Sequence, residues 1–453
     1  MHTANTPQRS LFLLASFLTQ CRPGSCLACL IVFTATLATA STALAWGRGH
    51  RDITEGALKA LPQWEKDLLG EELDLLGRQH CIIPDQVFTR KETQKYAMMD
   101  SKPNVVYLVE LHLPPAPAEA YEVLRYFMAK AVEELKAGRI HEGACYLGTL
   151  SHALEDWGCP AHSVPGDNMF TLMKQFLPPT EEYRFVPMHG PIEGGVFTVD
   201  LGEYQPKLLG TSVEEAAYNL LHRVQESTIR ARAQVIPIMQ ALYDQNEDAS
   251  NLAQQQAGQF DAAVVADAVH TVLSLAQQRF DPEAVTSLQQ ADLSTRIPLE
   301  APNLAIPQSA FFSKPYWGHA TRGVALREGK VSVPIRLVTS QNALGDAPLK
   351  DAVAVGTRAV LTYMVPLGVY DRLEVWAGLH ADLGTSGNVN FEIKGSDGKT
   401  LAKTQVLGDQ PAHLLTVPLT GLASIQLITT AGSTDSTSNY AVWAQPRLLK
   451  SKK

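Results

Sequence analysis

The chain has 453 residues, more than one hydrophobic core usually organises, so its length predicts a multidomain protein with two folded parts. Its formal net charge at pH 7 is -8. An acidic chain offers no overall basic surface, which argues against a protein that grips duplex nucleic acid by charge. No stable duplex partner is therefore expected.

The first 45 residues have the features of a secretory signal peptide. They contain Arg9 and Arg22 but no acidic residue, followed by the apolar run CLACLIVFTATLATASTALA, which ends in an A-L-A cleavage pattern. Cleavage after this pattern would make the protein secreted or periplasmic, with Trp46 as its first residue. A retained membrane anchor is the alternative, but Thr and Ser dilute the run and small residues end it.

Residues 46–280 are predicted to form an all-α domain. Apolar residues recur there at helical spacing, as in AEAYEVLRYFMAKAVEELKAG and GACYLGTLSHALEDW. Residues 281–311 carry several prolines and no clear period, and we interpret them as a linker. From 312 to 453, short β-type runs such as RLEVWAGL and VNFEIKG alternate with turn sequences, which predicts an antiparallel all-β sandwich.

The cysteines give no clear disulfide framework. Removal of the leader would leave Cys81, Cys145 and Cys159, an odd number. Pairing of two of them and burial of all three as small apolar side chains both remain open.

Histidines of the helical half lie near carboxylates in four clusters. The densest is HALEDWGCPAH, with His152, Asp156 and His162. On a helix, the first two lie one turn apart on the same side, as two ligands of one metal must, and Pro160 ends that helix before His162. The other clusters contribute His50 in WGRGH, Asp85 followed later by His112, and His189 with Glu193.

Imidazole nitrogen and carboxylate oxygen are the ligands that zinc takes in open catalytic sites. Any one such cluster is more often an ordinary surface or buried pair. The order of all four along the chain is what indicates a metal site, and it resembles that of the zinc-dependent phospholipase C family and the related single-strand-specific zinc nucleases. In both, a Trp exposed by signal cleavage is followed by a His, an Asp, a His, the motif H-x3-D-x5-H, and a His with an acidic ligand.

This resemblance covers roughly residues 46–240 and implies a phospholipase C-like helical fold with three zinc ions. It also implies a role for each candidate ligand. The first zinc would be held by Asp85, His112, His152 and Asp156; the second by Asp156 as a bridge with Trp46 and His50; the third by His162, His189 and Glu193. Trp46 would bind through its α-amino nitrogen and carbonyl oxygen, since a free α-amine loses its proton readily to a metal.

Asp85 would also be the catalytic base that orients the attacking water. Asp100, which lies 12 residues before His112, is a rival for the same position, because the gap from Asp85 to His112 is 27 residues. We favour Asp85 because Pro84 and Asp85 match a Pro-Asp pair of the family.

The implied activity is hydrolysis of a phosphodiester, with phospholipid the first-choice substrate and peripheral contact with a membrane. A nuclease acting on single strands is the alternative enzyme, which the short W-x3-H spacing favours. A third hypothesis is a non-catalytic protein in which metals only staple the helices and the sandwich binds glycan. The ligand set needs water to complete it, which favours an enzyme.

The C-terminal segments YWGHATRGVAL, GNVNFEIKGSDGKTL and NYAVWAQPRL resemble carbohydrate-binding modules found attached to glycoside hydrolases, over roughly residues 312–450. The resemblance implies a galactose-binding-like jelly roll and a glycan partner. Trp317, Trp376 and Trp443 could stack on sugar rings, because a flat apolar face suits the C–H side of a sugar. Trp376 and Trp443 lie inside apparent strands, however, where a core position is more common.

Overall fold

The computed structural model describes residues 48–100, 114–163, 197–299, 320–327, 331–340, 343–345, 347–357, 359–434 and 437–451. The predicted signal peptide and the candidate residues Trp46, His112, His189, Glu193 and Trp317 lie outside these ranges. No helix within the ranges combines the length and the apolar character needed to cross a membrane.

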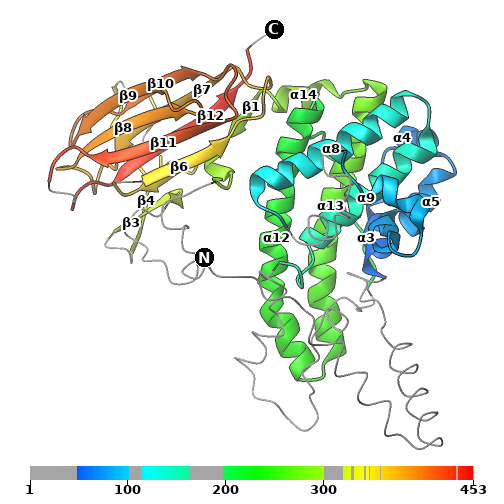
Figure 1. The fold of residues 1–453 in the computed structure, drawn as a ribbon. Coiled ribbons are helices and arrows are strands. Elements are labelled where there is room, and N and C mark those ends of the chain that lie inside the picture. The colour runs from blue at the N-terminus through cyan, green and yellow to red at the C-terminus, as the bar shows by residue number, and fades with distance from the viewer. Residues whose placement is uncertain are drawn as a thin grey trace, which may run out of the picture. The chain divides into compact units, whose positions relative to one another are not determined.

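The regular structure of the described chain from residue 49 to residue 287 is helical. The bounds of the helices are α3 Gly49–Lys59, α4 Gln63–Leu69, α5 Glu72–Arg78, η1 His80–Ile82, α6 Ile83–Gln86, η2 Lys91–Tyr96, α8 Pro117–Lys136, α9 Ile140–Trp157, α12 Val213–Tyr243, α13 Glu247–Gln277 and α14 Pro282–Ser287. The two longest, α12 and α13, run side by side (Figure 1). Ser212 and Asn246 cap their N-termini by accepting hydrogen bonds from the backbone N–H groups of Glu215 and Ala249.

Helix α9 lies at the centre of the helical part, packed against α8, α13, α5 and η1. Between Gly143 and Trp157 every residue of α9 except Tyr146 is buried. A helix buried all round is normally apolar, yet this one buries Thr149, His152, Glu155 and Asp156 among others. Such burial of polar side chains requires compensating partners.

A close contact at Gly148 fixes the position of η1 on α9. A Cβ atom at Gly148 would lie 2.3 Å from the carbonyl carbon of His80, so any other residue there would displace η1. The contact brings the backbone of η1, including the carbonyl of Cys81, onto the surface of α9. In this way the chain places α6, which follows η1 directly, beside the second half of α9.

The strands of the C-terminal half form two main antiparallel sheets and a hairpin. Their bounds are β1 Gln290–Asp292, β2 Thr321–Arg322, β3 Val324–Arg327, β4 Val331–Pro334, β5 Ala352–Val355, β6 Ala359–Met364, β7 Arg372–Leu379, β8 Asn388–Gly395, β9 Thr400–Leu407, β10 His413–Pro418, β11 Ser424–Ala431 and β12 Ala441–Leu449. One sheet has the order β10-β7-β12-β5-β2, with β1 paired to β12. The other has the order β6-β11-β8-β9 (Figure 1). β3 and β4 form the hairpin.

The two sheets enclose a core formed by alternating residues of the strands. On β8 the buried residues are Val389, Phe391, Ile393 and Gly395, which alternate with less buried neighbours. Phe391 meets Trp443 of β12, on the other sheet, edge to face with 5.0 Å between ring centroids. The predicted fold class, a helical half followed by an all-β sandwich, is confirmed.

The structure bears on two details of the sequence analysis. Trp443 is fully buried in the sandwich core, as its place inside a strand suggests, so its indole has no face open to a sugar, while Trp376 is partly buried. The first part of the predicted linker is regular structure, since α14 lies there and β1 pairs with Arg447–Leu449 of β12. Pro282 stands at the first turn of α14 behind the capping side chain of Asp281, a place where proline favours a helix.

Cys81, Cys145 and Cys159 of the helical half are buried, and no disulfide joins any two of them.

Candidate metal centre

Three histidines and a second carboxylate, from different segments, surround the carboxylate of Asp156. His50 comes from α3, Asp85 from α6, His152 and Asp156 from α9, and His162 from the turn that follows α9. All five are buried or nearly so. As helical spacing requires, His152 and Asp156 share one face of α9, with 3.3 Å between Nε2 and Oδ2.

The two oxygens of Asp156 face different histidines. Oδ2 lies 3.3 Å from Nε2 of His152, whereas Oδ1 lies 3.5 Å from Nε2 of His50 and 3.8 Å from Nε2 of His162. An N–H···O hydrogen bond measures about 2.7–3.2 Å. Two ligand atoms on one tetrahedral zinc, at bond lengths near 2.1 Å, are about 3.4 Å apart. The separations therefore fit a carboxylate that shares cations with its neighbours.

The outer nitrogens of two imidazoles are held by hydrogen bonds. Nδ1 of His50 lies 2.6 Å from Oε2 of Glu155, and Nδ1 of His152 lies 2.8 Å from the carbonyl oxygen of Cys81. The rings stack with 4.0 Å between centroids. A proton on each Nδ1 leaves the lone pair of Nε2 directed at Asp156, which is the arrangement of metal-binding histidines.

Several buried carboxyl groups lie close together at the centre. Burial raises the pKa of Glu155 well above its usual range, while the hydrogen bond from the Thr54 hydroxyl acts in the opposite direction. Burial raises the pKa of Asp261 as well, and the charge of Asp156 adds to that rise. Several acids in one buried space are costly unless positive charge compensates them, so this donor set favours cations.

The protonation of His152 reflects the same surroundings. Burial lowers its pKa, but Asp156 and Asp85 raise it more, to about 9. The two carboxylates thus stabilise a positive charge on His152. A metal ion bound at Nε2 would supply that charge in place of a proton.

The structure separates the two rival aspartates. Oδ1 of Asp85 lies 3.8 Å from Nε2 of His152, and only 5% of its side chain is exposed. Ligand atoms of His50, Asp85 and His152 all lie within 4.8 Å of one another. Asp100 is at the surface, with 79% of its side chain exposed and its carboxylate 3.2 Å from the ammonium group of Lys130.

Of the nine predicted ligands, the structure thus brings five together, and the other four lie outside the described residues. Sequence reasoning missed Glu155 and Thr54, which orient His50. A signal for both exists: Thr54 follows His50 by one helical turn, and Glu155 follows His152 by three residues on α9.

Several solved structures are similar to this chain. A structure of CBM51-2 with GlcNAc and INT domains from Clostridium perfringens ZmpB is 21% identical over 36% of this chain and 31% of that chain, with a TM-score of 0.29. CBM51 from Clostridium perfringens GH95 with methyl-galactose is 17% identical over 35% of this chain and 99% of that chain, with a TM-score of 0.28. Clostridium perfringens alpha-toxin from an avian strain is 13% identical over 86% of this chain and 84% of that chain, with a TM-score of 0.28.

The chain thus spans less than a third of the ZmpB structure. No curated protein sequence matched the chain. A family model of the NPCBM/NEW2 domain matches residues 352–449, from the first residue of β5 to the last of β12. The family match therefore describes the β-sandwich.

Proposed function

We propose that the helical half is a zinc-dependent phosphodiester hydrolase of the phospholipase C type. The observation that supports this most is the convergence of His50, His152 and His162 on the two oxygens of Asp156. The order of the same residues along the chain, which resembles the zinc phospholipase and nuclease families, supplies the reaction class.

The residues present fit zinc, because nitrogen and oxygen donors with anchored imidazoles make up its catalytic sites. Asp85, His152 and Asp156 would hold one ion, and Asp156 with His50 a second. His112, Trp46 and the set of His162, His189 and Glu193 would complete a cluster of three. Bound zinc supplies a Lewis acid for the phosphoryl oxygens and a water of lowered pKa.

The protein's own groups position the reactants. Asp85 has an oxygen to accept a hydrogen bond from the attacking water, which orients that water toward phosphorus. Glu155 and the Cys81 carbonyl hold the imidazoles of His50 and His152, so the ligand atoms need little rearrangement before reaction. Burial of the five described ligand candidates around Asp156 excludes bulk water and strengthens each electrostatic interaction.

Metal removal tests the proposal. Dialysis of the mature protein against a chelator should lower hydrolysis of bis(p-nitrophenyl) phosphate by more than about 100-fold, and added zinc should restore it. Zinc content is measured on the same samples. Full activity at zero zinc would contradict the proposal. Parallel assays on phosphatidylcholine vesicles and single-stranded DNA distinguish the preferred phospholipid from the alternative, a nuclease substrate.

We further propose that the β-sandwich binds glycan, on the strength of the NPCBM/NEW2 match over residues 352–449. Electrophoresis of the full-length protein through gels that contain galactose-bearing polysaccharides should show retardation relative to gels without glycan. Equal mobility in a panel of such gels would contradict glycan binding and leave the hydrolase proposal untouched.

A further inference from the structure

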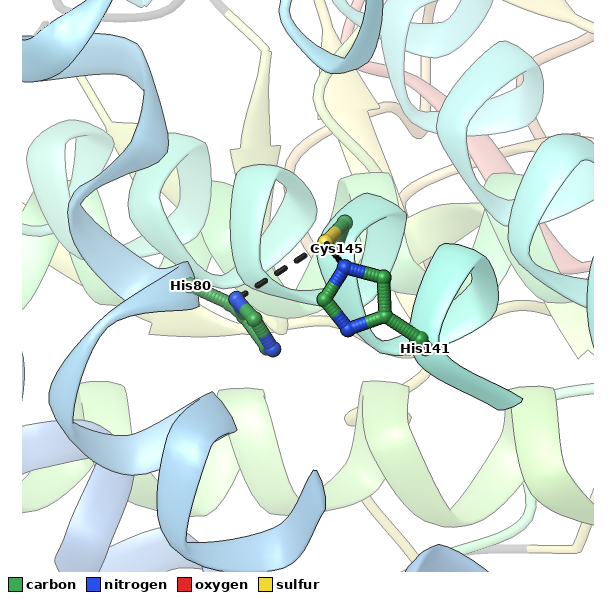
Figure 2. A group of neighbouring side chains, drawn as sticks. All are labelled: His80, His141 and Cys145. Atoms are coloured by element: carbon green, nitrogen blue, oxygen red, sulfur yellow. Dashed lines mark hydrogen bonds between the residues drawn. The ribbon is translucent and has the colours of Figure 1, made fainter. Parts of the chain in front are cut away.

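A second cluster of metal-binding side chains lies near the opposite end of α9. Figure 2 shows His80 of η1 and His141 of α9 on two sides of the Cys145 sulfur. The sulfur lies 3.7 Å from Nδ1 of His80 and 3.7 Å from Nε2 of His141. The three ligand atoms all fall within 4.8 Å of one another.

These separations match a shared zinc ion. With Zn–S near 2.3 Å, Zn–N near 2.1 Å and a tetrahedral angle, sulfur and nitrogen ligands are about 3.6 Å apart. His141 and Cys145 are four residues apart on one helix, which puts both on the same face. Two imidazoles and a thiol form a borderline-soft donor set that suits zinc.

Glu72 orients both imidazoles. Its Oε2 lies 2.8 Å from Nε2 of His80, and its Oε1 lies 3.1 Å from Nδ1 of His141. Each histidine can thus donate its outer N–H group to one carboxylate and direct its remaining lone pair at the sulfur. A single thiol hydrogen satisfies only one of these two lone pairs, whereas a cation between the three atoms satisfies both.

The surroundings of the thiol exclude the other chemistry that a Cys-His-Glu set offers, nucleophilic catalysis. Cys145 is only 3% exposed, so the thiol is not accessible to a substrate. The His141 side chain is 57% exposed, which gives a small cation a route from solvent.

We propose that His80, His141 and Cys145 form a second zinc site, separate from the centre around Asp156 and oriented by Glu72. Binding breaks the S–H bond of Cys145, forms a Zn–S bond, and releases the proton to solvent. Three protein ligands would leave one position of a tetrahedral ion for water.

The site has a positioning role. It joins α5, η1 and the start of α9, and His80 directly precedes Cys81, whose carbonyl oxygen holds His152. A zinc ion here would secure η1 on α9 without taking part in hydrolysis.

Cobalt(II) substitution tests the site independently of activity. A thiolate ligand gives bound cobalt a strong near-ultraviolet charge-transfer band, and the centre around Asp156 offers only nitrogen and oxygen donors. The full-length protein loaded with cobalt should show this band. Cys145→Ser should abolish it and lower bound cobalt by one ion per chain. Cys159→Ser, the same exchange at another buried cysteine, should retain both.

Two further variants guard against a folding defect in Cys145→Ser. His141→Ala changes a largely exposed side chain and should also remove or shift the band with far-ultraviolet circular dichroism unchanged. Glu72→Gln should weaken cobalt binding at this site about 10-fold. Absence of the band in the cobalt-loaded wild type, or its persistence in both Cys145→Ser and His141→Ala, would overturn the proposal.

Discussion

Asp156→Asn should lower phosphodiester hydrolysis by at least about 100-fold and reduce the zinc content of the protein. The amide keeps the shape of the side chain but loses its negative charge. In the wild type, Oδ1 and Oδ2 share this charge and face three histidines. Loss of groups that only orient ligands already costs about 10–100-fold, so loss of a shared ligand should cost more. Turnover of bis(p-nitrophenyl) phosphate and zinc per chain are the measurements.

Asp267→Asn is the matched control for this change. Asp267 is equally buried, but its carboxylate pairs with Arg223 and accepts hydrogen bonds from the Tyr204 hydroxyl and the backbone N–H of Lys207, away from the metal centre. Its loss should lower the free energy of unfolding and leave zinc content unchanged. If Asp156→Asn retained wild-type zinc and turnover, Asp156 would not be a shared ligand.

Asp85→Ala should abolish hydrolysis, whereas Asp100→Ala should leave it nearly intact. Asp85 lies beside His152 in the buried centre, while Asp100 makes an exposed ion pair with Lys130. Exposed pairs contribute little, so Asp100→Ala should change the free energy of unfolding by no more than about 0.5 kcal/mol. Initial rates and urea unfolding of the two variants give the comparison. Loss of hydrolysis in Asp100→Ala alone would mean that the order of ligands before His112 is misassigned.

The part of the site that could be predicted from sequence is the part carried by one helix or by motif order. His152 and Asp156 share a face of α9 because four residues make about one helical turn. The neighbouring Pro84 favours Asp85 over Asp100, and Oδ1 of Asp85 lies 3.8 Å from Nε2 of His152. Alternation along the strands likewise predicted the sandwich.

What could not be predicted depends on contacts between distant segments. The cluster of His80, His141 and Cys145 forms only because η1 lies against α9. That contact is possible because glycine at position 148 has no side chain. No periodic pattern in the sequence reports such an approach. The sequence favours a core position for Trp443, but alternation along a strand does not say which residue of the other sheet it meets, here Phe391.

Helix α9 carries ligand candidates of both clusters, His141 and Cys145 before Gly148, and His152 and Asp156 after it. One residue inserted between Cys145 and His152 would turn all later side chains by about 100° relative to the earlier ones. At present η1 contacts both sets through two consecutive residues, His80 and Cys81. After such an insertion the two sets would face different directions, and η1 could no longer contact both. Proteins that share this arrangement should therefore vary in length only in their loops, and the spacing from His141 to Asp156 should not change.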